Sequence, residues 1–157
     1  LNDERMRLLD ACEAKAGKHG ATVEEIIEAF IGPPMRLVLK SSEGQVFGKL
    51  VGRLHAETGE RFFMVMKKHF ASSVQRFGAA LHKACPSVDE EELCWRIHCA
   101  AGAMAHTLAH WNHLQVLSAG VMRTDNVDAA IGHLVRFLSA GFRADVRKTP
   151  AKKRKRK

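Results

Sequence analysis

The chain has 157 residues, of which 46% are hydrophobic and 27% charged, and this falls within the range of a single soluble globular domain. Its formal net charge is +8, but eight of its 25 basic residues lie within the last eleven positions, 147–157. The remaining 17 basic residues balance the 17 acidic ones, so the body of the protein is formally neutral. This distribution excludes a basic DNA-binding face across the whole fold and leaves only a basic tail.

No targeting or membrane segment is predicted. The first twenty residues contain four acidic side chains and lack the apolar core of a signal peptide, and the first residue is Leu1, as expected of a fragment or a processed start. The longest apolar run, 99–105, has seven residues and is too short to span a membrane. We interpret the cysteines as buried, reduced thiols of a cytoplasmic protein: Cys12, Cys85, Cys94 and Cys99.

Helical periodicity runs through nearly the whole chain, which has four prolines and no strict two-residue alternation. The pattern predicts an all-α fold in which residues 1–146 form one domain and 147–157 a disordered tail. Six main helices are expected, at about 2–17, 23–40, 44–57, 60–84, 88–113 and 125–147.

The first four predicted helices each carry one apolar stripe. The first ends at glycines, and the second begins at the capping box Thr22–Glu25. We expect Gly32-Pro33-Pro34 to break or kink the second helix, because proline has no N–H to donate. A capping box at Ser42–Gln45 starts the third helix, and Pro86 closes the fourth.

The last two predicted helices each have two apolar faces. The fifth starts at the capping box Ser87–Glu90 and is apolar all round between 99 and 105. The sixth is expected to be capped by Thr124 or Asp125, and Phe137 lies off its main stripe. Two apolar faces must be covered, either by other helices of the same chain or by a partner chain.

The order of these helices resembles the effector-binding and dimerisation part of TetR-type transcriptional regulators, in a branch that includes regulators of fatty acids or their thioesters. The sequence segments that carry the resemblance are Asn2–Arg5, Leu8–Asp10, Cys94–His98, Ala101–Met104, His106, Asp128–Ile131, Phe137–Leu138 and Gly141–Arg143. The resemblance implies that residues 1–17 connect to a DNA-binding helix-turn-helix head, which this chain does not contain. It also implies a homodimer in which the last two helices of each copy form a four-helix interface. The Ala-rich body without tyrosine is typical of a bacterial protein.

The same resemblance implies a pocket between the middle helices for a small, largely apolar effector, whose binding tilts the connecting helix. The predicted lining is Phe30, Phe62, Phe63, Met66, Phe70, Trp95, His98 and Met104. The predicted dimer interface contains Ala101, Gly102, Ala105, Leu108, Trp111, Leu134, Phe137 and Leu138. The alternatives are a solid core in place of the pocket and an ordinary pair of helices within the chain in place of the interface.

Two polar segments also have alternative interpretations. His106, His110 and His113 have a spacing that can bind Zn²⁺ or Ni²⁺, but no carboxylate completes the set, so they are interpreted as a polar strip and no cofactor is predicted. The tail either binds DNA phosphates in a salt-dependent way or acts as a solubilising end. Its candidate residues are Lys152, Lys153, Arg154, Lys155, Arg156 and Lys157.

The sequence contains no GxSxG, P-loop, GxGxxG or HExxH motif, so we do not predict an enzyme. Our first hypothesis is the ligand-sensing, dimerising domain of a TetR-type regulator that reads DNA through a head outside this chain. The alternatives are a stand-alone helical carrier of a metal ion or a lipid-like molecule, and a helical enzyme without a recognisable motif.

Overall fold

A computed structural model of the chain describes residues 1–40, 44, 46, 48 and 60–145, with the side chains of 60–63, 65–67, 69 and 112 left out. The elements follow in the order α1 (Asn2–Ala16), the 3₁₀ helix η1 (Gly17–His19), α2 (Val23–Leu39), α4 (Glu60–Ala84), α5 (Glu90–Leu117) and α6 (Val127–Arg143). No strand occurs in these described ranges, so the predicted all-α class is confirmed. Most of the predicted helix at 44–57, the capping box Ser42–Gln45 and the tail lie outside them.

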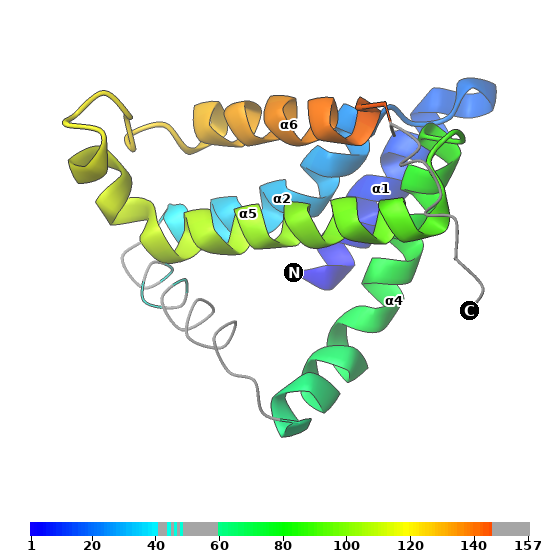
Figure 1. Cartoon of the computed structure of the whole chain (residues 1–157), viewed down its shortest axis with the longest axis horizontal. Coiled ribbons are helices and arrows are strands. Elements are labelled where there is room, and N and C mark those ends of the chain that lie inside the picture. Colours follow the sequence, from blue (N-terminus) through cyan, green and yellow to red (C-terminus); the bar gives the residue numbers. More distant parts are fainter. Residues whose placement is uncertain (41–43, 45, 47, 49–59, 146–157) are drawn as a thin grey trace, which may run out of the picture.

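The described helices form layers around α2. In Figure 1, α5 and α6 lie lengthwise beside each other and are joined by the connection 118–126, while α4 runs away from them at a steep angle. α2 packs mainly against α6 and also against α5, and α1 covers α2 and α4. No helix in the described part of the chain is long and apolar enough to cross a membrane.

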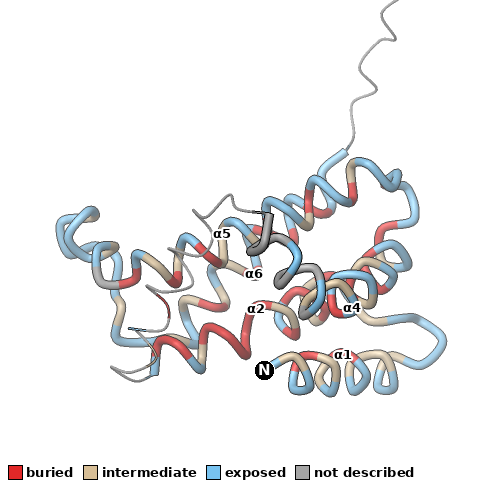
Figure 2. Tube along the Cα trace, turned by 90° about the horizontal axis from the view of Figure 1, so that it is seen from below, coloured by how far each residue is buried: buried red, intermediate tan, exposed pale blue. Residues whose placement is uncertain are grey.

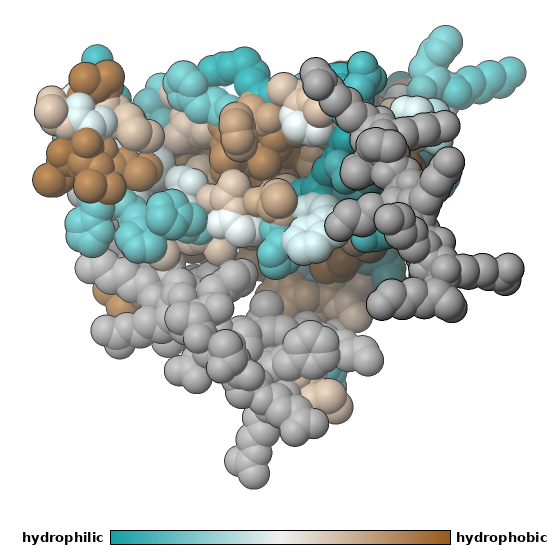
Figure 3. All heavy atoms as spheres, viewed as in Figure 1, coloured by the Kyte–Doolittle hydropathy of each residue, from teal (hydrophilic) through white to brown (hydrophobic). Residues whose placement is uncertain are grey.

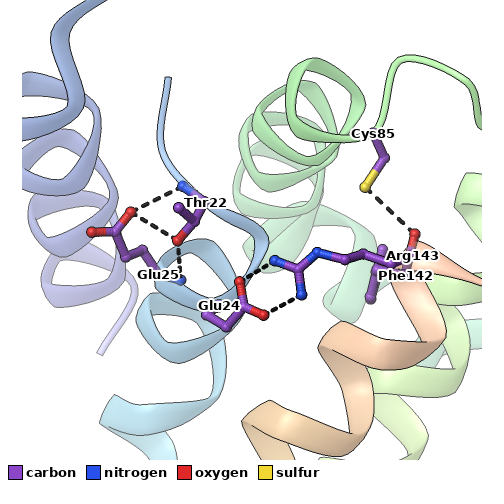
Figure 4. Close-up of polar contacts among 6 residues, drawn as sticks. All are labelled: Thr22, Glu24, Glu25, Cys85, Phe142 and Arg143. Atoms are coloured by element: carbon purple, nitrogen blue, oxygen red, sulfur yellow. Dashed lines mark hydrogen bonds and ion pairs between the residues drawn. The ribbon is translucent and has the colours of Figure 1, made fainter. Parts of the chain in front are cut away.

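α2 is the centre of the core because most of its side chains are apolar and almost all of them are buried. Figure 2 shows buried residues along most of this helix, in contrast to the exposed α5–α6 connection. The predicted capping box at its start is confirmed (Figure 4): Thr22 Oγ1 accepts from the Glu25 N–H at 3.3 Å, and the Glu25 carboxylate accepts from the Thr22 N–H at 2.9 Å. These bonds satisfy two donors that the first helical turn leaves free.

α2 continues through Pro33 and Pro34 as one helix, so of the two expected outcomes, a break or a kink, the break does not occur. In a regular helix the Phe30 carbonyl accepts from the N–H of residue 34, which proline lacks. Arg5 of α1 replaces the missing donor, because its Nε–H donates to the Phe30 carbonyl at 2.7 Å. A side chain from another helix therefore satisfies a carbonyl that Pro34 leaves without its usual partner.

Ion pairs connect α2 and α6 at both ends and show that the two helices run antiparallel. Glu24, in the first turn of α2, pairs with Arg143 in the last turn of α6 through both carboxylate oxygens (Figure 4). Arg36, near the end of α2, pairs with Asp128 in the first turn of α6 at 2.8 Å. The Arg143 hydrogen bond lowers the pKa of Glu24. Both pairs are partly exposed, so they fix the alignment of the helices more than they add stability.

The starts of α5 and α6 differ from the predicted ones. Asp89, not Ser87, caps α5 by accepting from the Glu92 N–H at 2.8 Å. Asn126, rather than Thr124 or Asp125, caps α6 by accepting from the Ala129 N–H at 2.9 Å. Asp and Asn accept at this position as well as Ser or Thr does, and the sequence offers several acceptors in a row, so local pattern alone does not select one.

All four cysteines are free, but they are not all buried. Cys85 is buried and Cys12 is partly buried, whereas Cys94 and Cys99 are exposed on α5. The interpretation of every cysteine as a buried thiol is therefore wrong for the last two. Both lie on the side of α5 that faces away from the core of the chain.

Candidate functional site

A groove of about 840 Å³ lies between the C-terminal half of α5, the connection 118–126 and the first part of α6. Its apolar lining is Trp111, Leu114, Val121, Met122, Leu134 and Phe137. Arg123 and Asp125, paired at 2.7 Å, are among its polar residues. The sequence pattern predicts no cavity here, but three of the predicted dimer residues, Trp111, Leu134 and Phe137, come together in this groove.

The groove belongs to a larger exposed apolar surface, which we call the α5–α6 surface. It consists of the exposed side chains of Val116, Leu117, Val121, Met122 and Phe137, together with the partly exposed Leu114 and Leu134 of the groove lining. Figure 3 shows apolar atoms gathered over the α5–α6 connection and over the middle of α6. The Phe137 side chain is 71% exposed, although full burial of such a side chain is worth about 1.5–3 kcal/mol. Exposed apolar side chains gathered on neighbouring elements in this way are typical of an interaction site.

The predicted dimer residues fall into two groups. Gly102 and Phe137 are exposed, and Ala101 and Leu134 are partly exposed, so these four are accessible to a second chain. The other four are already buried in the core of the chain: Ala105, Leu108, Trp111 and Leu138. This is the packing within one chain that the sequence left open as the alternative to a dimer interface.

The described pocket residues are brought together only in part, because Phe30 and Met104 both border Arg5 whereas Trp95 and His98 do not join them. Phe30, Phe70 and Met104 are partly buried, but Trp95 is 60% exposed and its ring meets the exposed His98 edge-on. Trp95 and His98 lie on the side of α5 opposite its buried face, so they do not share a pocket with Met104. The side chains of Phe62, Phe63 and Met66 lie outside the described part of the structure.

The core beside Phe30 is solid among the described residues. The Phe30 and Phe77 rings pack edge to face with centroids 5.2 Å apart. The void between them and their neighbours has a volume of about 10 Å³, which is about the size of one water molecule. At this position the structure supports the solid core that the sequence analysis kept as the alternative.

Arg5 is a residue that the sequence analysis missed. Its side chain is buried, with only 3% of the residue exposed, and burial lowers its pKa to about 10. The guanidinium lies 4.7 Å from the centre of the Phe30 ring, and Nη2 lies 3.6 Å from Met104 Sδ. A signal was present, because Arg5 lies four residues before Leu9 and therefore on the buried side of the first helix.

The histidine strip is exposed on the outer side of α5. The His106 and His110 rings stack with centroids 4.3 Å apart, and the His113 ring lies 6.1 Å from that of His110. His110 Nδ1 lies 3.1 Å from the His106 carbonyl oxygen. Within the described ranges, no group of three His, Cys, Asp or Glu side chains is arranged to hold a metal ion.

An all-helical domain with an exposed apolar surface on its last two helices is typical of proteins that pair through helices. The family model described as "Tetracyclin repressor-like, C-terminal domain" matches residues 28–141, which is more than half of the chain. The chain therefore belongs to this family, whose members are the ligand-binding and dimerisation domains of transcription regulators. The comparison with curated proteins gives no match.

Proposed function

We propose that the chain is the effector-sensing and dimerising part of a TetR-type regulator, and that two copies pair through the α5–α6 surface. The observation that carries this proposal is the exposed apolar surface on α5 and α6, within the part of the chain that the family model covers. A small, largely apolar effector binds each copy and controls a DNA-binding head that precedes α1.

The role of α1 follows from its position. It is the first element of the chain, and it contacts both α2 and α4. Arg76 of α4 holds it through two ion pairs, with Asp10 at 2.8 Å and with Glu13. A change in the packing of α2 or α4 around an effector would therefore move α1, and with it a head attached to its N-terminus.

The proposed dimer interface can be tested with two substitutions that leave the fold of one copy undisturbed. Phe137→Glu, on the α5–α6 surface, places a charge on a side chain that is already exposed, so it harms only a contact with another molecule. Gly102→Leu tests a predicted dimer residue on the outer side of α5, away from the groove, and adds bulk at a site where no atom lies within 4 Å of an added Cβ. We expect both variants to weaken dimerisation at least about tenfold, measured by size-exclusion chromatography with light scattering.

The matched controls make comparable changes at exposed positions of other helices. Leu37→Glu alters an exposed leucine of α2, and Ala79→Leu adds bulk to an exposed position of α4. Both controls should dimerise like the wild type. Equal dimerisation of all five proteins, or dissociation caused equally by the controls, would refute pairing through this surface.

A further inference from the structure

His106 and His110 bring two exposed imidazole rings together on α5. The rings stack with their centroids 4.3 Å apart. Two nitrogens bound to one tetrahedral Zn²⁺ ion, each at about 2.1 Å from it, lie about 3.4 Å from each other. Residues four apart on a helix lie one above the other, so small rotations of the two rings bring a nitrogen of each to that separation.

The tautomer of His110 leaves one of its ring nitrogens available to a metal ion. Nδ1 of His110 donates to the His106 carbonyl oxygen at 3.1 Å, since a carbonyl oxygen can only accept, and the lone pair of the neutral ring is then on Nε2. A bond of this kind is the usual support of a metal-binding histidine. His133 of α6 is the contrast, because its Nδ1 accepts from Arg136 Nη2 at 3.0 Å and its lone pair is already used.

One copy of the chain supplies only part of a metal site. The His113 ring lies 6.1 Å from that of His110, and the described ranges contain no group of three His, Cys, Asp or Glu side chains arranged to hold a metal ion. A closed zinc site has four protein ligands in a tetrahedral arrangement. A site built on His106 and His110 therefore needs two further ligands from another molecule.

The histidine strip borders the surface that a second copy is proposed to cover. His110 lies four residues before Leu114, and His113 lies four residues before Leu117, so each is the helical neighbour of a residue of the α5–α6 surface. His106 continues the strip by one turn. Two identical copies related by a twofold axis present the same patch to each other, so residues near the axis meet their own counterparts.

We propose that two copies of the chain share one divalent transition-metal ion, with Zn²⁺ as the best fit, and that His106 and His110 of each copy are its four ligands. Imidazole nitrogens suit zinc, copper and nickel, and four of them complete a tetrahedral site. This inference rests on the proposed pairing and adds a metal site to it. An ion bound in this way favours the dimer by mass action, because one copy alone holds only half of the site.

The test titrates Zn²⁺ into the untagged full chain by isothermal titration calorimetry, with Mg²⁺ as the comparison ion. We expect one Zn²⁺ per two chains, because the ligands come from both copies. Mg²⁺ should bind at least about a hundredfold more weakly, because it prefers oxygen ligands. The stoichiometry distinguishes a site shared between two copies from a site within one copy.

His106→Ala and His110→Ala should each weaken Zn²⁺ binding at least about tenfold, because each removes two of the four ligands of the shared site. Both side chains are exposed and alanine favours a helix, so neither variant disturbs the fold of one copy. His82→Ala is the matched control, since His82 is an exposed histidine of α4, and it should bind Zn²⁺ like the wild type.

The proposal is overturned if Zn²⁺ binds no more tightly than Mg²⁺, if one Zn²⁺ binds per chain, or if both His variants bind Zn²⁺ like the wild type. Sedimentation equilibrium of the wild type in EDTA separates this result from the proposed function. A dimer in EDTA that lacks the shared zinc site contradicts only the metal assignment. A monomer in EDTA contradicts pairing through the α5–α6 surface.

Discussion

Ser139 and Arg5 are both buried polar residues, but they differ in how far their hydrogen bonds are satisfied. Arg5 Nε has a short bond to the Phe30 carbonyl, whereas the Ser139 hydroxyl, on α6, has no hydrogen-bond partner within the described part of the chain. An unsatisfied buried hydroxyl costs about 1–3 kcal/mol relative to a satisfied one. Such a cost is large compared with the total stability of a small domain.

We therefore expect Ser139→Ala to leave the free energy of unfolding unchanged or to raise it by up to about 1 kcal/mol, because it removes a polar group that forms no bond. Urea denaturation followed by circular dichroism measures this. Ser118→Ala is the contrasting variant, since Ser118 Oγ accepts from the Met122 N–H at 2.8 Å, and it should be destabilised by about 0.5–1 kcal/mol. A clear loss of stability in Ser139→Ala would show that its hydroxyl has a partner.

The sequence could have predicted part of the arrangement at Arg5. Pro34 removes the N–H that normally bonds to the Phe30 carbonyl, and this follows from helix geometry alone. Which side chain supplies the replacement depends on how α1 packs on α2. That contact joins residues 25 positions apart, so no local pattern encodes it.

At the scale of the helices, Arg96 of α5 stabilises the C-terminal end of α6. Its Nη1 and Nη2 donate to the carbonyls of Phe142 and Ala144 at 2.6 and 2.8 Å, and Cys85 Sγ lies 3.5 Å from the Phe142 oxygen (Figure 4). The last carbonyls of a helix have no partner within it, and a cation near them also interacts favourably with the helix dipole. Arg96 thus joins the ends of α5 and α6 farthest from the 118–126 connection.

Arg96→Met should lower the free energy of unfolding by about 1–3 kcal/mol, because it leaves two carbonyls and the Glu92 carboxylate without their donor. Thermal denaturation followed by circular dichroism is the measurement. Arg136→Met, at an exposed position of α6, should change the stability by no more than about 0.5 kcal/mol. Similar losses in the two variants would contradict the role of Arg96.

The helices themselves were largely predictable, because apolar residues repeat with helical spacing through most of the described chain. The start of α2 was also predictable, since Thr22 is the only good acceptor next to its first apolar residue. The starts of α5 and α6 were not, because several acceptors precede each. The sequence did not predict that Trp95 and His98 face away from the core. A helix with two apolar faces does not indicate which of them faces the core.

At the scale of the whole molecule, the sequence indicated that α5 and α6 carry more apolar surface than one chain buries. The structure supports this through the exposed side chains of Val116, Leu117 and Phe137. The sequence did not indicate the groove. Val121 and Met122 lie in the connection 118–126, where no periodicity relates them to a helix face. α5 also continues to Leu117 instead of ending near 113, so Leu114 of the groove lining lies on the helix beyond its predicted end.

Pairing through the α5–α6 surface is the claim on which the proposed function rests. Sedimentation equilibrium of the wild-type chain, at concentrations from about 1 to 50 μM, tests it most directly, because stable helical interfaces of this kind have dissociation constants in or below that range. We predict a single species with twice the chain mass of 17.4 kDa. A mass of 17.4 kDa throughout that range would contradict the account.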